Sequence, residues 1–117
     1  MHELSLCYAL LEQVERIAKQ QQAERVVSIR LQIGPLAGIE PELLQRAFPL
    51  VIPGSLAAGA ELVIEPLPLR IHCTTCEWEG EATPSHLRCP HCESLQTQVI
   101  SGEEMLLASL ELERVGE

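Results

Sequence analysis

The chain has very few aromatic residues and no long apolar run. It contains one tryptophan, one tyrosine and one phenylalanine among 117 residues, so its core must be built mainly from aliphatic side chains. No stretch approaches the roughly 18 apolar residues of a membrane span, and the amino terminus lacks the basic start and apolar run of a signal peptide. We therefore expect a single folded domain of modest size, with room for no more than a small insertion. We expect it in the cytoplasm, without a membrane partner.

Basic residues are scarce as well. Seven arginines and one lysine stand against 17 glutamates, and the formal net charge is -9. A protein that binds a nucleic acid duplex gains most of its affinity by neutralising phosphates with Lys and Arg, but the arginines here are scattered along the chain. We expect no nucleic acid partner. The excess of acidic residues favours attraction to cations or to basic protein surfaces, or simply forms a well-solvated surface.

Hydrophobic periodicity predicts two helices and three strands. Apolar residues recur at three- and four-residue steps between Leu4 and Gln21, which is typical of an amphipathic helix. A second helix is expected after Ile39 because Pro41 suits its first turn, and Pro49 should stop or kink it. Alternation of period two predicts strands over 25–33, 61–65 and 106–113. The expected fold is mixed α/β: a small three-stranded sheet with two helices on one face, plus an inserted four-cysteine zinc ribbon.

Three details of this pattern can be checked directly. Pro66 and Pro68 cannot donate ladder hydrogen bonds, so the later part of the second strand must be an edge or irregular. In the first strand, period two places Val26 with the polar residues, on the face away from the core. Cys7 falls on the apolar stripe of the first helix, and we expect a small core residue there with no chemical role.

Four of the five cysteines form two pairs, with two residues between the members of each pair. The pairs are Cys73 with Cys76 and, after twelve further residues, Cys89 with Cys92. This spacing lets both thiolates of a pair reach one ion from a single tight turn, and two such turns complete the tetrahedral four-sulfur set of a structural zinc site. The intervening Trp78-Glu79-Gly80 suits a short hairpin. We predict a zinc ribbon whose closed site holds the fold and does not catalyse.

Other chemistries stay open for the same cysteines. Tetrahedral sulfur also suits iron, and paired cysteines can form a thiol-disulfide couple. His72, His86 and His91 flank the cluster and could replace a thiolate or tune it. Because four cysteines already fill the coordination sphere, we expect these histidines to face solvent in loops.

The first three residues, Met1, His2 and Glu3, form a second candidate metal site. A retained terminal amine, the deprotonated amide of His2 and the His2 imidazole can form two fused chelate rings. An amide or carboxylate from Glu3 or beyond could complete a planar set of four ligands. Square-planar ligation by nitrogen and oxygen favours Ni(II) or Cu(II).

Taken together, the sequence resembles the HypA/HybF family of hydrogenase nickel-insertion metallochaperones along essentially its whole length. The segments that carry the resemblance are Met1–Leu6, Ile33-Gly34, Ile39–Leu43, the four-cysteine ribbon and Gly102–Leu106. It implies a carrier that is not an enzyme. Such a carrier would deliver Ni(II) to the large subunit of a nickel-iron hydrogenase, working with a companion maturation GTPase.

The resemblance also implies the metal ligands and the domain boundaries. The implied nickel ligands are His2 and the amine of Met1, with Glu3 beside them and Glu40 where some members place a carboxylate. The implied Zn(II) ligands are Cys73, Cys76, Cys89 and Cys92. A nickel-binding α/β domain would comprise residues 1–69 and 99–117, and a zinc-ribbon domain residues 70–98.

Two other classes of function fit parts of the sequence. A zinc-ribbon interaction module of the transcription or translation machinery should show a basic face, against which the charge of -9 argues. A thiol oxidoreductase or metal-assisted hydrolase needs an acid/base constellation beside its reactive groups, and none is evident here. The sequence leaves open whether the chain forms a homodimer and which hydrogenase it serves.

Overall fold

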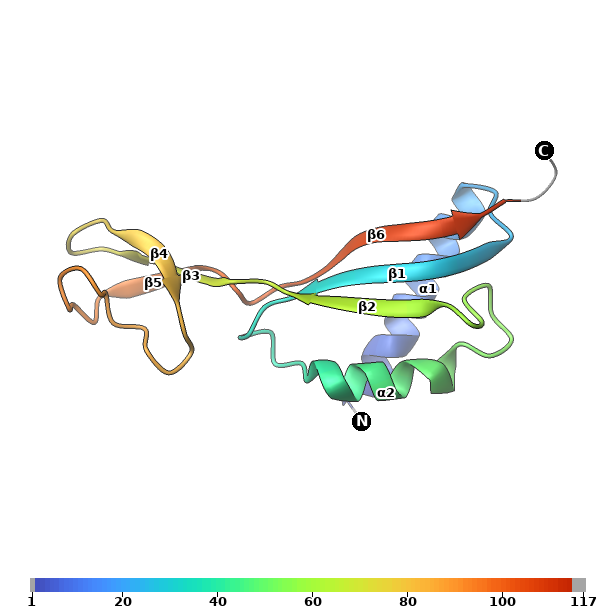
Figure 1. The fold of residues 1–117 in the computed structure, drawn as a ribbon, viewed down its shortest axis with the longest axis horizontal. Helices are drawn as coiled ribbons and strands as arrows, with labels where there is room; N and C mark the ends of the chain where they lie inside the picture. Colours follow the sequence, from blue (N-terminus) through green and yellow to red (C-terminus); the bar gives the residue numbers. More distant parts are fainter. Residues whose placement is uncertain (1, 115–117) are drawn as a thin grey trace. The chain divides into compact units, whose positions relative to one another are not determined.

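The computed structural model describes residues 2–114, except for the side chain of His2. Its elements follow one another as shown in Figure 1: α1 (His2–Gln20), β1 (Arg25–Ile33), α2 (Pro41–Val51), β2 (Glu61–Pro66), β3 (Leu69–Cys73), β4 (Glu79–Ala82), β5 (Thr97–Ser101) and β6 (Met105–Glu113). The chain divides into two compact units. We call them the α/β unit, which contains both helices, and the ribbon unit, which consists of Gln32–Gly38 and Pro66–Met105.

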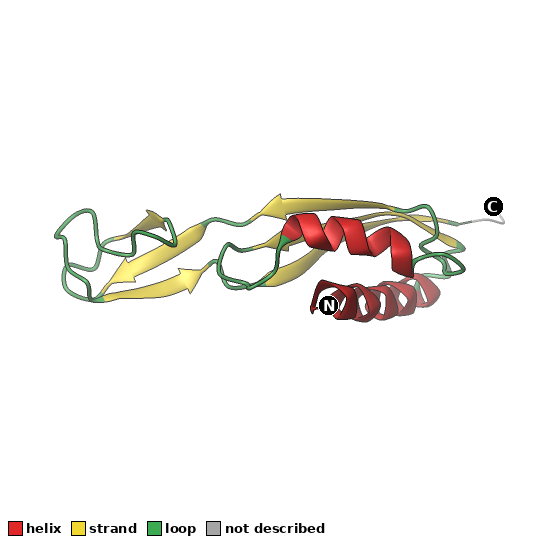
Figure 2. Ribbon diagram, turned by 90° about the horizontal axis from the view of Figure 1, so that it is seen from below, coloured by secondary structure: helices red, strands yellow, loops and turns green. Residues whose placement is uncertain are grey.

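The α/β unit is built on a three-stranded sheet in the order β2-β1-β6. Both helices lie on the same side of this sheet (Figure 2), and the predicted fold class is confirmed. The apolar stripe of α1 and the inward residues of β1 form an aliphatic core against α2. Cys7 is fully buried there, and its Sγ lies 3.7 Å from the carbonyl oxygen of Leu44. Burial raises the pKa of this thiol, so Cys7 is a core residue, as expected.

The predicted edge strand is also confirmed, since β2 is the outer neighbour of β1 in its sheet. The side-chain amide of Gln45 on α2 donates a 2.8 Å hydrogen bond to the carbonyl of Leu62. The helix thereby satisfies one of the strand's backbone acceptors. Val26, expected to face away from the core, is instead fully buried. Its N–H donates to the carbonyl of Leu56, so the chain preceding β2 covers it.

Pro49 does not stop the second helix, which continues to Val51. A proline near the end of a helix removes only one intrahelical hydrogen bond. The buried side chains of Phe48 and Val51, on either side of it, hold the last turn on the core. Packing therefore outweighs the local preference of proline.

The ribbon unit has its own three-stranded sheet, in the order β4-β3-β5 and antiparallel throughout. The expected hairpin after the first cysteine pair is present, because β3 pairs with β4 through Ile71 opposite Gly80. Strand β5 is an addition that the sequence analysis did not anticipate. It pairs Val99 with the other side of Ile71.

A close backbone contact ties the segment Gln32–Gly38 into the ribbon unit. The N–H of Gly34 donates to the carbonyl of Glu104, and the N–H of Leu36 donates to that of Gly102, both at 2.8 Å. A Cβ on Gly34 would overlap the backbone of Gly102, so only glycine allows this approach.

Neither described helix has the length and apolar character that a membrane span requires.

Candidate metal centre

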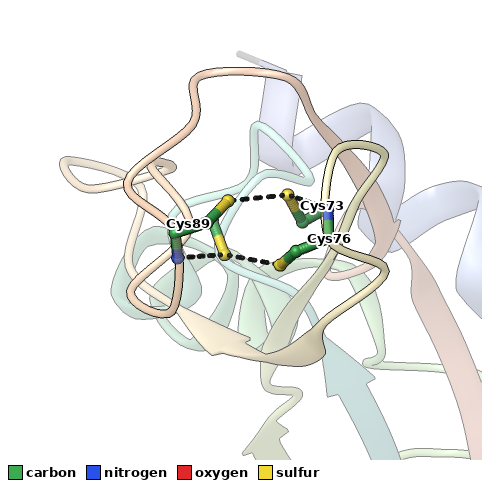
Figure 3. A group of neighbouring side chains, drawn as sticks. Cys73, Cys76 and Cys89 are labelled. Atoms are coloured by element: carbon green, nitrogen blue, oxygen red, sulfur yellow. Dashed lines mark hydrogen bonds between the residues drawn. The ribbon is translucent and has the colours of Figure 1, made fainter.

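The four paired cysteines converge on one point of the ribbon unit. Cys73 ends β3 and Cys76 follows in the next turn, while Cys89 and Cys92 lie in a turn between β4 and β5. All four sulfurs lie within 4.8 Å of one another. Figure 3 shows the labelled Cys73, Cys76 and Cys89 turning their sulfurs toward a common space. The sequence prediction that these side chains meet is confirmed.

The sulfur spacing fits a tetrahedral metal ion. The sulfurs of Cys73 and Cys92 are 3.6 Å apart, as are those of Cys76 and Cys89. Zn–S bonds of about 2.3 Å at tetrahedral angles place the sulfurs about 3.8 Å apart. Four soft donors at this spacing can hold zinc or iron, and they leave no coordination position for water.

Backbone N–H groups point at two of the sulfurs. The amide of Cys76 lies 3.4 Å from the sulfur of Cys73, and the amides of His91 and Cys92 each lie 3.4 Å from the sulfur of Cys89. In each tight turn, backbone N–H groups thus lie close to the sulfur of the first cysteine. Donors directed at sulfur favour the thiolate form, which is the form that binds metal.

The thiols of the cluster differ widely in pKa. The backbone hydrogen bond from Cys76 is the main factor that lowers the pKa of Cys73 to about 6. A backbone hydrogen bond from Trp78 acts in the same direction on Cys76, but burial and the neighbouring thiols outweigh it and raise the pKa of Cys76 to about 12. The Cys73 thiolate forms readily, whereas the pKa values of Cys76 and Cys92 are raised, so a bound cation would favour the loss of their protons.

The three nearby histidines lie outside the group of converging sulfurs. His72 Nδ1 lies 3.0 Å from a carboxylate oxygen of Glu79, and His86 Nδ1 lies 3.3 Å from the hydroxyl of Ser85. His86 and His91 are exposed. Among the described side chains, which begin at Glu3, the group that could hold a metal through His, Cys or acidic side chains consists of the four cysteines.

Hydroxyl groups connect the two metal-binding turns, a feature that the sequence analysis missed. The hydroxyls of Thr75 and Ser94 lie 2.9 Å apart, and Thr74 Oγ1 donates to the carbonyl of Gln96 at 2.9 Å. These partners are about twenty residues apart in the chain, and no local pattern indicates such a pairing. Serine and threonine beside the cysteine pairs were the only signal available.

The amino-terminal candidate site is described only in part. Met1 lies outside the described residues, as does the side chain of His2, although the backbone of His2 begins α1. Glu3 lies in the first turn of α1, where a carboxylate is favourable to the helix dipole. A carboxylate oxygen of Glu3 lies 3.4 Å from the backbone nitrogen of Glu40, the residue that precedes α2. The Glu3 carboxylate therefore contacts the backbone of Glu40, the other glutamate that the resemblance implies.

Comparisons with known proteins show the family of the chain. Residues 1–112 match the family described as "Hydrogenase/urease nickel incorporation, metallochaperone, hypA". The hydrogenase maturation factor HypA of Nitrosospira multiformis is 45% identical over 112 residues, which cover 96% of this chain and 97% of that protein. The corresponding factor of Aquifex aeolicus is 43% identical over 113 residues, or 97% and 98% of the two chains.

Two solved structures are similar along nearly the whole chain. The solution structure of the Ni metallochaperone HypA from Helicobacter pylori is 25% identical with a TM-score of 0.69, covering 97% of this chain and 98% of that one. A second solution structure, titled HypA protein, is 28% identical with a TM-score of 0.72, covering 96% of each chain. The arrangement of elements described above is therefore shared with these proteins.

The family match over residues 1–112 assigns the chain to the metallochaperones, which are not enzymes, and the four-sulfur ribbon gives it a candidate metal centre. The chain belongs to the HypA family of nickel metallochaperones for hydrogenase maturation. The family that the sequence resembles is thus confirmed.

Proposed function

We propose that this chain binds Ni(II) at its amino terminus and delivers it to the large subunit of a nickel-iron hydrogenase during maturation. The observation that carries the proposal is the family match, which begins at the first residue and extends through the ribbon. The position of Glu3 in the first turn of α1 supports it, because it places a carboxylate oxygen donor directly after His2 in the chain. The proposed ligands are His2, the amine of Met1 and, in a supporting role, Glu3.

The proposal assigns Zn(II) to Cys73, Cys76, Cys89 and Cys92. The sulfur distances fit a tetrahedral ion, and a closed four-thiolate shell suits zinc in a purely structural role. The proposed domains are a nickel-binding part at 1–69 and 99–117 and a zinc ribbon at 70–98. A companion maturation GTPase, a cytoplasmic location and a homodimer belong to the same proposal.

The two sites are suited to different tasks. A closed cage of four thiolates exchanges its metal slowly, which suits an ion that holds a fold. A site at the chain terminus can change its ligands one at a time in favour of an acceptor. The affinity of a given set of ligands for divalent metal ions rises toward copper, so ligand strength alone does not select nickel. Planar geometry and the supply of metal in the cell must provide the selectivity.

The test is nickel binding by untagged protein with an authentic Met1, compared with a His2→Ala variant. The variant should bind no nickel at concentrations that saturate the parent, because it lacks the imidazole donor. Its thermal midpoint should fall by no more than about 2 °C, since a terminal residue carries little packing energy. A protein extended before Met1 is the matched control, because the amine becomes an amide. Nickel binding of parental strength by His2→Ala would refute the terminal site.

The number of protons released when nickel binds shows whether the ligands are the amine and imidazole or carboxylates. An imidazole and an amine with ordinary pKa values of about 6.5 and 7.7–8.0 must lose protons to bind nickel, whereas glutamates are already ionised. Apparent nickel affinity should therefore fall steeply between about pH 8 and 6. Calorimetry in buffers of different ionisation enthalpy counts the protons released at pH 7. A count near zero would favour Glu3 and Glu40 over the proposed ligands.

A further inference from the structure

The ribbon unit carries an exposed apolar and basic surface that the proposed function does not use. We call it the docking patch and define it by the residues that line a hollow of about 430 Å³: Ser85, His86, Leu87, Arg88 and Leu95. Leu95 is 73% exposed and Leu87 is 37% exposed. Two leucines at the rim of one hollow form a small apolar binding surface rather than isolated exposed side chains.

The charge of the docking patch is opposite to that of the chain. None of its residues is acidic, although the chain has a net charge of -9. Among the described residues, Arg25 and Arg30 form ion pairs with glutamates, whereas no ion pair involves Arg88. An exposed, unpaired guanidinium beside two leucines is suited to a carboxylate that a partner supplies.

An adjacent hollow limits what the patch can accept. This second hollow, of about 390 Å³, is also lined by His86 and Arg88, but Glu81 and Glu93 contribute to its wall. These two glutamates repel a second carboxylate on that side. The patch should therefore prefer one carboxylate next to an aliphatic side chain over a densely acidic segment.

Hydrogen bonds and the metal turn hold the patch in shape. Thr97 Oγ1 donates to the carbonyl of Leu87 at 2.6 Å, and the N–H of His86 donates to the carbonyl of Thr83 at 2.9 Å. The N–H of Cys89 donates to the carbonyl of Ser94, next to Leu95, at 3.0 Å. A surface ordered before binding loses less conformational entropy when a partner docks.

We propose that the docking patch binds an extended segment of a partner protein in which an aliphatic residue lies beside a carboxylate. The aliphatic side chain occupies the hollow between Leu87 and Leu95, and the carboxylate pairs with Arg88. The proposal does not depend on nickel. It does rest on a metal at the four cysteines, because the second metal-binding turn lies between the two leucines in the chain.

The first experiment selects peptides from a random octapeptide phage library on the metal-loaded full-length chain. The double variant Arg88→Glu/Leu95→Ser serves for counter-selection. The expected result is enrichment of peptides with Leu, Ile or Met adjacent to Asp or Glu. Enrichment of basic or purely aromatic peptides, or no enrichment over the double variant, would overturn the proposal.

The second experiment measures the affinity of the best peptide by fluorescence anisotropy. Arg88→Gln and Leu95→Ser should each weaken binding by about tenfold, as expected for loss of one charge-assisted hydrogen bond or one aliphatic contact. The matched controls are Arg16→Gln, which removes an exposed arginine of α1, and Leu50→Ser, since Leu50 is 74% exposed on α2. Equal weakening by the controls would overturn the proposal.

Metal analysis of every variant separates this proposal from the proposed function. A variant that retains one metal ion per chain but loses the peptide tests the docking patch alone. Chelation of the parent should abolish peptide binding, and nickel binding by the parent and by Arg88→Gln should be equal. If His2→Ala loses nickel yet binds the peptide as well as the parent does, the two functions are separate.

Discussion

The two units of this protein are stabilised in different ways. In the α/β unit, buried side chains of α1, β1 and α2 form the core, and Phe48 is the largest of them. In the ribbon unit the buried hydrophobic residues are few: Ile33, Leu69, Ile71 and two of the four cysteines, Cys73 and Cys89. A folded unit this small rarely buries enough apolar surface to be stable without a metal or disulfides. The comparison indicates that the first unit depends on packing and the second on its ion.

Removing the metal should have the largest effect and should separate the two units. Structural zinc contributes on the order of 10–16 kcal/mol in small ribbons and fingers. Chelation, or the Cys92→Ser substitution, should therefore unfold the ribbon unit and leave α1 and β1 protected. Hydrogen exchange read residue by residue measures this directly, and metal analysis should find about one zinc per chain in the parent.

The cysteine of the other unit provides the control for that experiment. Cys7→Ala should retain the metal and lose only about 1 kcal/mol of stability, because Cys7 is a small residue of the aliphatic core. Equal loss of protection in both units after chelation would contradict the comparison. Free thiols without any metal would contradict it too, and iron as the resident metal would contradict the assignment of zinc.

Truncating the core of the α/β unit should produce the converse pattern. Phe48 is 2% exposed, and replacing a buried Phe with Ala costs about 3–5 kcal/mol. Phe48→Ala should lower the protection of α1, α2 and β1 while the ribbon keeps its metal. Leu50→Ala, at a position that is 74% exposed, should change stability by less than about 0.5 kcal/mol. Loss of metal from Phe48→Ala would show that the ribbon depends on the packing of the other unit.

A glycine contact in the ribbon unit tests whether its stability comes from the metal alone. Gly34→Ala would push a Cβ into the backbone of Gly102, which cannot move aside as a flexible side chain can. We expect a loss of about 3 kcal/mol and lower protection of the Leu36 N–H. Gly38→Ala is the control, because a Cβ there meets nothing within 4 Å and only its φ of 76° is unfavourable. It should cost about 1 kcal/mol. Equal effects of the two substitutions would mean that the close contact is unimportant.

Sequence patterns predicted most of the fold because its signals are local. The helical stripe of α1, the alternation of β1 and the two cysteine pairs each lie within one element or turn, and each was found at the expected place. The convergence of all four sulfurs could also be predicted, since metal coordination has a fixed geometry. The burial of Val26 could not be predicted, because it depends on the chain near Leu56.

The remaining features depend on contacts between distant parts of the chain. Strand β5 has no strong alternation of apolar residues, and its pairing with β3 exists only once the cysteine turns have brought the chain back. The proximity of Glu3 to Glu40 likewise joins residues 37 positions apart. Pro49 was expected to stop or kink α2 by a local rule, but the helix continues past it to Val51, and Phe48 and Val51 are buried.

The smallest expected effect concerns a carboxylate that supports the turn before β6. Glu104 Oε1 accepts a 2.8 Å hydrogen bond from the N–H of Gly102, and this bond is the main factor that lowers the pKa of Glu104. Because its pKa is lowered on folding, the carboxylate stabilises the turn above the ordinary glutamate pKa of about 4.3. That stabilisation is lost as the pH falls through the lowered pKa. The contribution is small because Glu104 is accessible to solvent.

An NMR pH titration of the Gly102 amide, with the metal retained, measures this effect. In the parent, the amide shift should move with a midpoint below the ordinary pKa of glutamate. Glu104→Gln should abolish the movement while retaining the metal, and Glu103→Gln should leave it unchanged because no hydrogen bond joins the Glu103 side chain to this amide. A midpoint at or above the ordinary value would mean that the carboxylate does not hold the turn.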